Sequence, residues 1–341
     1  MADALLKELS NTDLDWLIAS GERQRLPSGQ PLFDAQNPTN HLYLLIEGRL
    51  GLPPSQSTGP GVTEEVLQGE FVGLSPLLGL SNDATVSTLS ESLILSLPIA
   101  QVQAKLKADI DFAAHFYRAI AVMLSDRLRR IFEAPDRIQL WGKRSAKEAL
   151  AVFRELRDSD IDWLVSFGEI QPVNANQVLL QVGRPVDAFY IILDGQFGLS
   201  APGGSFNALL LCFAGLDENT QNQQVFAQLS RGGLPGIISF LDFRPLPVTV
   251  RAMQNATVFA VPRQTLVTKL QVDASFASRF YRVIAIQILE LLETICERMA
   301  STSANADLND DEELDFDALD QMSEGAKKFN WMLNQLGVNY G

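Results

Sequence analysis

The sequence contains few of the residues that most catalytic and metal sites require. It has two cysteines and two histidines among 341 residues. Cys212 and Cys296 lie in apolar surroundings without metal-ligand spacing, which favours a reducing compartment. His41 and His115 have no nucleophile or carboxylate at catalytic spacing, so we expect structural roles for both. We therefore expect a protein that is not an enzyme and that holds no metal.

Positive charge and long apolar runs are also scarce. There are 27 Lys and Arg residues against 41 Asp and Glu residues, which gives a formal net charge of −14. That field does not favour nucleic acid as a partner. The basic residues of "DRLRRI" (126–131) form a mild local patch, which we interpret as a solvated helix face. No apolar run approaches the roughly 20 residues that span a bilayer. The acidic, amphipathic start is not typical of a signal peptide, so the expected location is the cytoplasm.

The sequence does contain an internal repeat. Residues 9–52 align without gaps with residues 156–199 at a constant offset of 147, with 15 identities in 44 positions. The match resumes after unequal inserts, where "FAAHFYRAIA" (112–121) aligns with "FASRFYRVIA" (276–285). Two copies of this length are too few and too long for a solenoid. The repeat therefore predicts two copies of one domain.

Each copy is expected to open with a short helix, continue with strands and close with a long helix. We expect Thr12-Asp13 and Ser159-Asp160 to cap the opening helices. Short apolar runs bounded by Gly, Pro and Asn predict strands, and many short strands indicate a barrel or jelly roll. The long helices are predicted by apolar residues at spacings of three and four, namely Phe112, Phe116, Ile120 and Leu124, then Phe276, Phe280, Ile284 and Ile288.

These patterns predict a mainly β fold with flanking helices, of the α+β class. The first domain is expected over residues 1–140 and the second over 141–300. Residues 301–341 follow as an acidic linker and a C-terminal amphipathic helix.

The plan of helix, eight-strand roll, short inner helix and long C-terminal helix resembles the cyclic nucleotide-binding domain. The segments that carry the resemblance are "LPSGQPLFDAQNPTNHLYLLIEGRLGL", "GEFVGLSPLLGLSNDATVSTLSESLILSLP" and "LPGIISFLDFRPLPVTVRAMQNATVFAVP". It covers most of residues 8–132 and 155–297, and it implies two tandem jelly-roll domains, each with a long C-terminal helix. The overall plan is also similar to a two-copy group found in cyanobacteria beside bacteriocin-type export systems.

The resemblance implies a phosphate-binding cassette in each copy. In the family the cassette runs Gly-Glu, a few small or apolar residues, then Arg, any residue, Ala, Thr and Val. The arginine grips the cyclic phosphate with two donors, and the short inner helix directs its N–H groups at the phosphate. The candidate ligand-binding residues of this chain are Gly73, Ser75, Asn82 and Thr85 in the first copy, and Gly236, Ser239, Arg244 and Thr249 in the second.

Both polar anchors of the cassette are absent from both copies. Leu74 and Ile237 occupy the position of the glutamate, and Asn82 and Leu246 occupy that of the arginine. A charge-assisted hydrogen bond contributes about 1.5–3 kcal/mol, so losing both arginine bonds should weaken cyclic nucleotide binding by roughly two to four powers of ten. We therefore expect no bound cofactor. Arg244, two positions before the matched site, is either aimed inward by a rearranged loop or solvated.

The tail contains a second candidate site. Residues 301–341 carry nine acidic and two basic residues. Phe329, Met332, Leu333 and Leu336 form one apolar stripe on the predicted helix. The stripe either docks on the chain's own domains or inserts into the groove of a protein partner, so these four residues are the candidate partner contacts.

The sequence thus favours a non-enzymatic regulatory or adaptor protein whose two degenerate domains act through protein–protein contacts. The alternative is a sensor that binds a cyclic nucleotide or another small anion, with the second domain favoured because of Arg244. A homo-oligomer is compatible with either hypothesis.

Overall fold

The computed structural model describes residues 7–34, 37–52, 64–80, 85–132, 152–200, 225–301 and 316–337. The chain divides into two units. Unit 1 comprises Met1–Leu124 and Ile284–Asn309, and unit 2 comprises Ser125–Val283 and Asp310–Gly341. Each long helix crosses a unit boundary, so its end belongs to the unit that contains the other copy's strands. The predicted domain boundary at residue 140 falls outside the described ranges.

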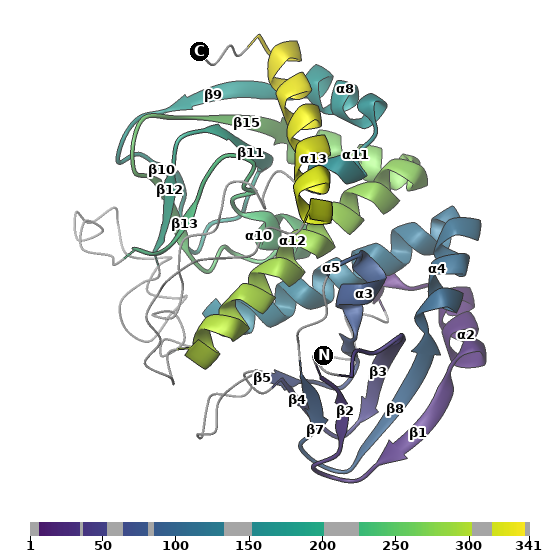
Figure 1. Cartoon of the computed structure of the whole chain (residues 1–341). Helices are drawn as coiled ribbons and strands as arrows, with labels where there is room; N and C mark the ends of the chain where they lie inside the picture. Colours follow the sequence, from purple (N-terminus) through teal and green to yellow (C-terminus); the bar gives the residue numbers. More distant parts are fainter. Residues whose placement is uncertain are drawn as a thin grey trace. The chain divides into compact units, whose positions relative to one another are not determined.

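Unit 1 is built on two four-stranded antiparallel sheets, drawn in purple to blue in Figure 1. Their strand orders are β1-β8-β3-β6 and β2-β7-β4-β5. The strands are β1 (Glu22–Leu26), β2 (Pro31–Phe33), β3 (His41–Glu47), β4 (Leu50–Leu52), β5 (Glu64–Val66), β6 (Phe71–Val72), β7 (Val86–Thr88) and β8 (Ser92–Pro98). The helices are α2 (Asn11–Ser20), α3 (Leu74–Leu78), α4 (Ile99–Ala108) and the first part of α5 (Ile110–Phe132). Both sheets contribute to one apolar core that includes Phe33, Leu45, Val72 and Ile94.

Unit 2, whose strands are drawn in teal and green in Figure 1, repeats this plan. Its described strands form sheets of order β11-β15-β9 and β10-β14-β12-β13. They are β9 (Glu169–Val173), β10 (Val178–Leu180), β11 (Ala188–Asp194), β12 (Phe197–Ser200), β13 (Val225–Leu229), β14 (Thr249–Ala252) and β15 (Ala256–Pro262). The helical elements are the 3-10 turn η1 (Val152–Glu155), α8 (Asp158–Phe167), α10 (Ile237–Asp242), α11 (Arg263–Val272), α12 (Ala274–Ser301, whose end lies in unit 1) and α13 (Phe316–Gln335).

Strand register confirms the duplication. Tyr43 on β3 faces Ser96 on β8, and the matching Tyr190 on β11 faces Ala260 on β15. The register shifts between Leu45 and Glu47 in one copy, and between the equivalent residues Ile192 and Asp194 in the other. A bulge repeated at the same position is a built-in feature of the fold rather than a local accident.

The predicted apolar faces of the long helices are confirmed. Phe112, Phe116, Ile120 and Leu124 are buried, as are Phe276, Phe280, Ile284 and Ile288. Neighbouring rings on each helix stack, Phe112 on Phe116 and Phe276 on Phe280. The predicted fold class, antiparallel jelly-roll-like sheets with flanking helices, is likewise confirmed. Among the described residues, every helix is too short or too polar to span a bilayer.

The predicted caps of the opening helices are wrong by two residues. Helix α2 is capped by Ser10, whose amide donates to Asp13 Oδ2 at 2.9 Å while its hydroxyl accepts from the Asp13 amide. In α8 the amide of Arg157 donates to Asp160 Oδ2 at 2.8 Å. Each aspartate therefore lies inside the first turn and reaches back, as the acidic partner of a capping box does.

The same two aspartates fasten the opening helix to the long helix. Asp13 Oδ2 lies 3.0 Å from His115 Nδ1 on α5. At the equivalent place in unit 2, Arg279 on α12 donates from Nε and Nη2 to Asp160 at 2.6 and 2.7 Å. The structural role predicted for His115 thus consists of one defined contact with a buried carboxylate.

We expect the Asp13→Asn variant to lose stability only where the carboxylate is ionised. Burial raises the pKa of Asp13, but hydrogen bonds from Ser10 and the contact with His115 lower it below its ordinary value. A carboxyl group with a depressed folded pKa stabilises the fold above its unfolded pKa of about 3.9, and that contribution is lost as pH falls through the folded pKa. The variant should lose roughly 1 kcal/mol near neutral pH.

Thermal midpoints measured from acidic to neutral pH would test this expectation. The exposed Asp15→Asn on the same helix is the matched control and should change little. A midpoint difference that stays constant across the whole pH range would contradict the linkage.

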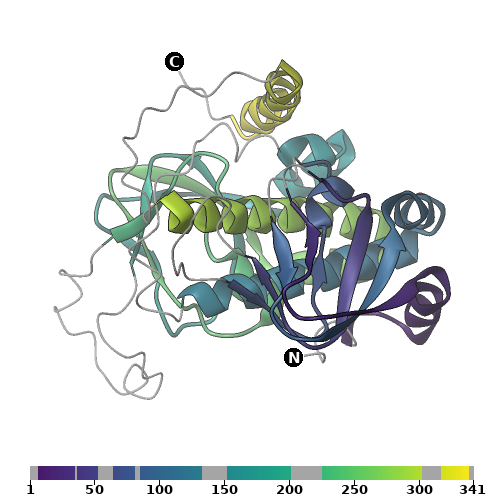
Figure 2. The ribbon, with the colours of Figure 1, turned by 60° about the horizontal axis from the view of Figure 1, so that its bottom comes forward.

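The C-terminal helix α13 docks on its own unit. Phe329 and Met332 are fully buried and Leu333 nearly so, while Leu336 is half-buried. Phe329 meets Phe153 of η1 edge-to-face at 5.1 Å, and the two views show α13 (yellow) beside α8 (teal) (Figures 1 and 2). Of the two alternatives for the apolar stripe, the structure has the intramolecular one. The docked helix therefore does not offer Phe329, Met332 or Leu333 to a partner.

Candidate functional site: two cassettes

The first cassette begins where β6 turns into α3. Gly73 caps this helix with φ +80°, and a Cβ there would lie 2.6 Å from the His41 carbonyl oxygen, so only glycine fits. Ser75 is buried in the first turn, and its hydroxyl donates to Oε1 of Glu293 on α12 at 2.5 Å. A short hydrogen bond to a carboxylate is among the stronger ones in proteins. The long helix α12 is thus bonded directly to this cassette.

The second cassette has the same frame with a different end. Gly236 caps α10 with φ +78°, and a Cβ there would lie 2.6 Å from Leu180 Cδ1. The helix ends at Phe243, whose φ of +61° is rare for an aromatic residue. Thr249 is fully buried, and its hydroxyl accepts a hydrogen bond from the Val182 amide at 3.3 Å. That contact occupies one acceptor position of a hydroxyl that the family resemblance assigned to a ligand.

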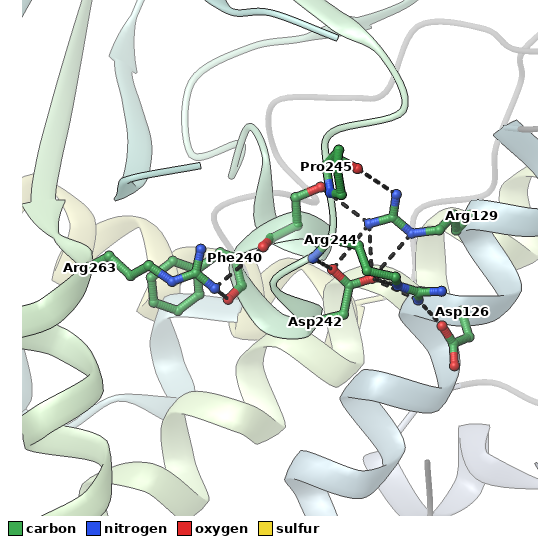
Figure 3. Close-up of polar contacts among 8 residues, drawn as sticks. Asp126, Arg129, Phe240, Asp242, Arg244, Pro245 and Arg263 are labelled. Carbon is green, nitrogen blue, oxygen red and sulfur yellow. Dashed lines mark hydrogen bonds and ion pairs between the residues drawn. The ribbon is translucent and has the colours of Figure 1, made fainter. Parts of the chain in front are cut away.

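A guanidinium group from the end of α5 is bonded to this cassette (Figure 3). Arg129 Nη2 lies 3.1 and 2.9 Å from the two carboxylate oxygens of Asp242, and Nε lies 3.1 Å from Oδ2. Nη1 donates to the Pro245 carbonyl at 2.7 Å, and Nη2 also lies 3.2 Å from the Ser239 hydroxyl. The Arg129 and Asp242 side chains are 7% and 6% exposed. Every nitrogen of a buried guanidinium is therefore occupied by the cassette.

Arg244 extends the same network toward solvent. Its Nε donates to Asp242 Oδ2 at 2.8 Å, and Nη2 pairs with Asp126 on α5. The side chain remains about half exposed. Neither predicted alternative for Arg244 describes it, because it is held at the surface by two carboxylates rather than aimed inward or left solvated.

Arg263 braces the other side of the cassette. Its guanidinium lies 3.8 Å from the centre of the Phe243 ring and donates to the Val186 carbonyl oxygen at 2.7 Å. It also donates to the Phe240 carbonyl oxygen at 2.5 Å (Figure 3). Stacking a cation on an aromatic face is favourable and helps to hold Phe243 in its unusual backbone conformation.

Burial raises the pKa of Asp242 above its ordinary value, while the Arg129 charge and the hydrogen bonds from Arg244 and Arg129 act in the opposite direction. Burying an isolated carboxylate costs free energy, and the charges of these cations offset that cost for Asp242.

The structure brings together part of the predicted site. Gly73 and Ser75 lie at α3, Gly236 and Ser239 at α10, and Thr249 begins β14. Thr85 is half-buried just before β7, and Asn82 lies outside the described residues. Where they are described, the residues matched to the family's polar anchors are apolar. Leu74 and Leu246 are buried, at 3% and 1% exposure, and Ile237 is half-buried.

Sequence reasoning missed Arg129, Asp242 and Glu293. The interpretation of "DRLRRI" as a solvated face is wrong, because Arg127 and Arg129 are buried. A weak signal was available, since Arg129 and Glu293 occupy equivalent positions of the duplicated helix and both are charged. Within the described residues, no group of three or more His, Cys, Asp or Glu side chains could hold a metal ion.

Comparison with known proteins agrees with this geometry. Residues 23–109 and 170–273 match the family model of the cyclic nucleotide-binding domain, together more than half of the chain. Uncharacterized NTE family proteins of Mycobacterium tuberculosis and Mycobacterium bovis are 24% identical over 142 residues, which is 42% of this chain and 21% of those proteins. The chain thus spans about a fifth of the length of these curated relatives.

Two solved structures illustrate the likeness. The regulatory domain of Toxoplasma gondii PKA with cAMP is 16% identical and has a TM-score of 0.28, over 80% of this chain and 89% of that one. A putative cyclic nucleotide-binding protein from Geobacter metallireducens is 18% identical and has a TM-score of 0.32, over 36% of this chain and 91% of that one. From the two matched ranges and the repeated cassette frame, we conclude that the chain belongs to the cyclic nucleotide-binding domain family and contains two copies of that domain.

Proposed function

We propose that this protein is a non-enzymatic regulatory or adaptor protein, located in the cytoplasm, whose two degenerate domains act through contacts with other proteins. The observation that carries the proposal is the pairing of cations at the second cassette. Arg129 is satisfied by Asp242, Ser239 and Pro245, and Arg244 is bonded to two carboxylates. Arginines whose charges are already paired in this way are expected to bind a cyclic phosphate only weakly.

The apolar anchor positions support the same proposal. A ligand phosphate placed against buried Leu246 would lose its water without gaining a charged partner, and that loss is costly. The proposal includes membership of the two-copy cyanobacterial group, for which the tandem plan is the support.

A ligand sensor is the second candidate, favoured by the half-exposed Arg244 and by the family itself. Such a sensor would take a cyclic nucleotide or another small anion at the second cassette.

We expect calorimetric titration of the full chain with cyclic AMP, cyclic GMP and cyclic dinucleotides to give no saturable binding tighter than about 1 mM, because two charge-assisted bonds are missing. Micromolar binding that is abolished by Arg244→Ala would favour the sensor instead. Arg25→Ala, at an exposed ion pair elsewhere in the fold, is the matched control. Turnover of any nucleotide would contradict the non-enzymatic part of the proposal.

Partner recruitment can be tested through the tail. Pull-downs are made with the full chain and with a chain lacking residues 301–341. Both should capture the same proteins if partners bind the two jelly-roll domains and α13 serves only to pack against unit 2. Partners that vanish with the tail would assign the binding role to α13, after release from its docked position.

A further inference from the structure

One position of the duplicated long helix engages a cassette in both units. "FAAHFYRAIA" and "FASRFYRVIA" align at an offset of 164, and the same offset places Arg129 of α5 opposite Glu293 of α12. Arg129 donates to the Ser239 hydroxyl of the second cassette, and Glu293 accepts from the Ser75 hydroxyl of the first. Both serines are buried in the first turn of their cassette helix. Each helix end therefore contacts the cassette of the other sequence copy.

The charge at this position fits the cassette that it meets. The second cassette helix ends in Asp242, whose carboxylate takes two hydrogen bonds from Arg129 Nη2. The first cassette helix, "LSPLL", contains no charged residue, and its serine donates to Glu293. A glutamate at position 129 would face the buried carboxylate of Asp242, and an arginine at position 293 would find no carboxylate on α3. Exchanging the two charges would therefore place two carboxylates together at the second cassette. At the first cassette it would leave a guanidinium with the Ser75 hydroxyl as an acceptor but with no counter-charge on α3.

We propose that positions 129 and 293 form a duplicated coupling device, in which the end of each copy's long helix holds the cassette of the other copy. The opposite charges of Arg129 and Glu293 make the two contacts non-interchangeable and so fix which helix each cassette accepts. The coupling consists of the chain's own side chains and needs no bound ligand. It is independent of the proposed function, because it holds whether or not the protein recruits partners.

Hydrogen–deuterium exchange of the full chain without nucleotide tests the device. Arg129→Glu should speed amide exchange in residues 236–246 by about tenfold or more and leave residues 71–80 within about twofold. Glu293→Arg should give the reverse pattern. The controls are Lys107→Glu and Glu22→Arg, which make the same charge changes at exposed positions.

A rescue variant separates coupling from general loss of stability. Arg129→Glu combined with Asp242→Arg restores an ion pair with reversed charges, and Arg244→Gln is added so that no second cation faces position 242. This variant should recover protection of residues 236–246. The proposal is overturned if either single variant accelerates exchange equally in both cassettes, or if the reversed pair restores nothing. A failed nucleotide titration has no bearing on this result, so the two proposals stand or fall separately.

Discussion

Replacing Arg129 with methionine is expected to lower the free energy of unfolding of unit 2 by about 3–5 kcal/mol. The variant removes the guanidinium but leaves the Asp242 carboxylate buried among the groups that Arg129 had bonded. Arg244 still donates to Asp242 but is half exposed, so the carboxylate loses the buried partner that offsets its desolvation. The loss of such a partner is one of the few causes of so large a change, and burial already raises the pKa of Asp242. Urea unfolding followed by tryptophan fluorescence and circular dichroism would measure the change.

Two further variants make this expectation specific. Arg129→Met combined with Asp242→Leu removes both charges and should recover most of the loss, since an apolar pair of similar volume is often as stable as a buried ion pair. Arg25→Met breaks the exposed pair with Glu91 and should cost less than about 1 kcal/mol. If the double variant were as unstable as Arg129→Met alone, lost packing rather than the stranded charge would be the cause.

Truncating Phe329 to alanine is the second change with a large expected effect, a loss of about 3–5 kcal/mol from a fully buried ring. The ring contacts Phe153, and the Arg231 guanidinium lies 5.1 Å from its centre, so the variant leaves a cavity under a stacked cation. Limited proteolysis near residues 316–335 and the urea midpoint of unit 2 would report the undocking of α13.

The exposed Gln335→Ala on the same helix is the control and should have nearly wild-type stability. Unchanged proteolysis in Phe329→Ala would show that the apolar stripe is not what holds α13. Increased capture of other proteins by this variant would indicate that docking and partner binding compete for one face.

The two-domain fold could be predicted from the sequence because the duplication and the apolar periodicity can be read directly from the order of residues. Fifteen identities at a constant offset predicted two copies, and the spacing of Phe112 and Phe116 predicted a helix face that is indeed buried. The cap positions were missed by two residues because Ser10 and Thr12 are both good caps in isolation. Only the reach of the Asp13 carboxylate back to Ser10 separates them.

From the sequence alone it follows that there are two copies, that each has a cassette beginning at a glycine, and that the family's glutamate and arginine are absent from both. What the cassettes contact is visible only in the folded chain. Arg129 is separated from Asp242 by 113 residues, and Ser75 from Glu293 by 218. Pairing at such separations depends on where two helices end in space, which neither propensity nor periodicity encodes. For the same reason, the basic stretch 126–131, which the sequence suggested was solvated, contributes Arg129 to a buried ion pair with Asp242.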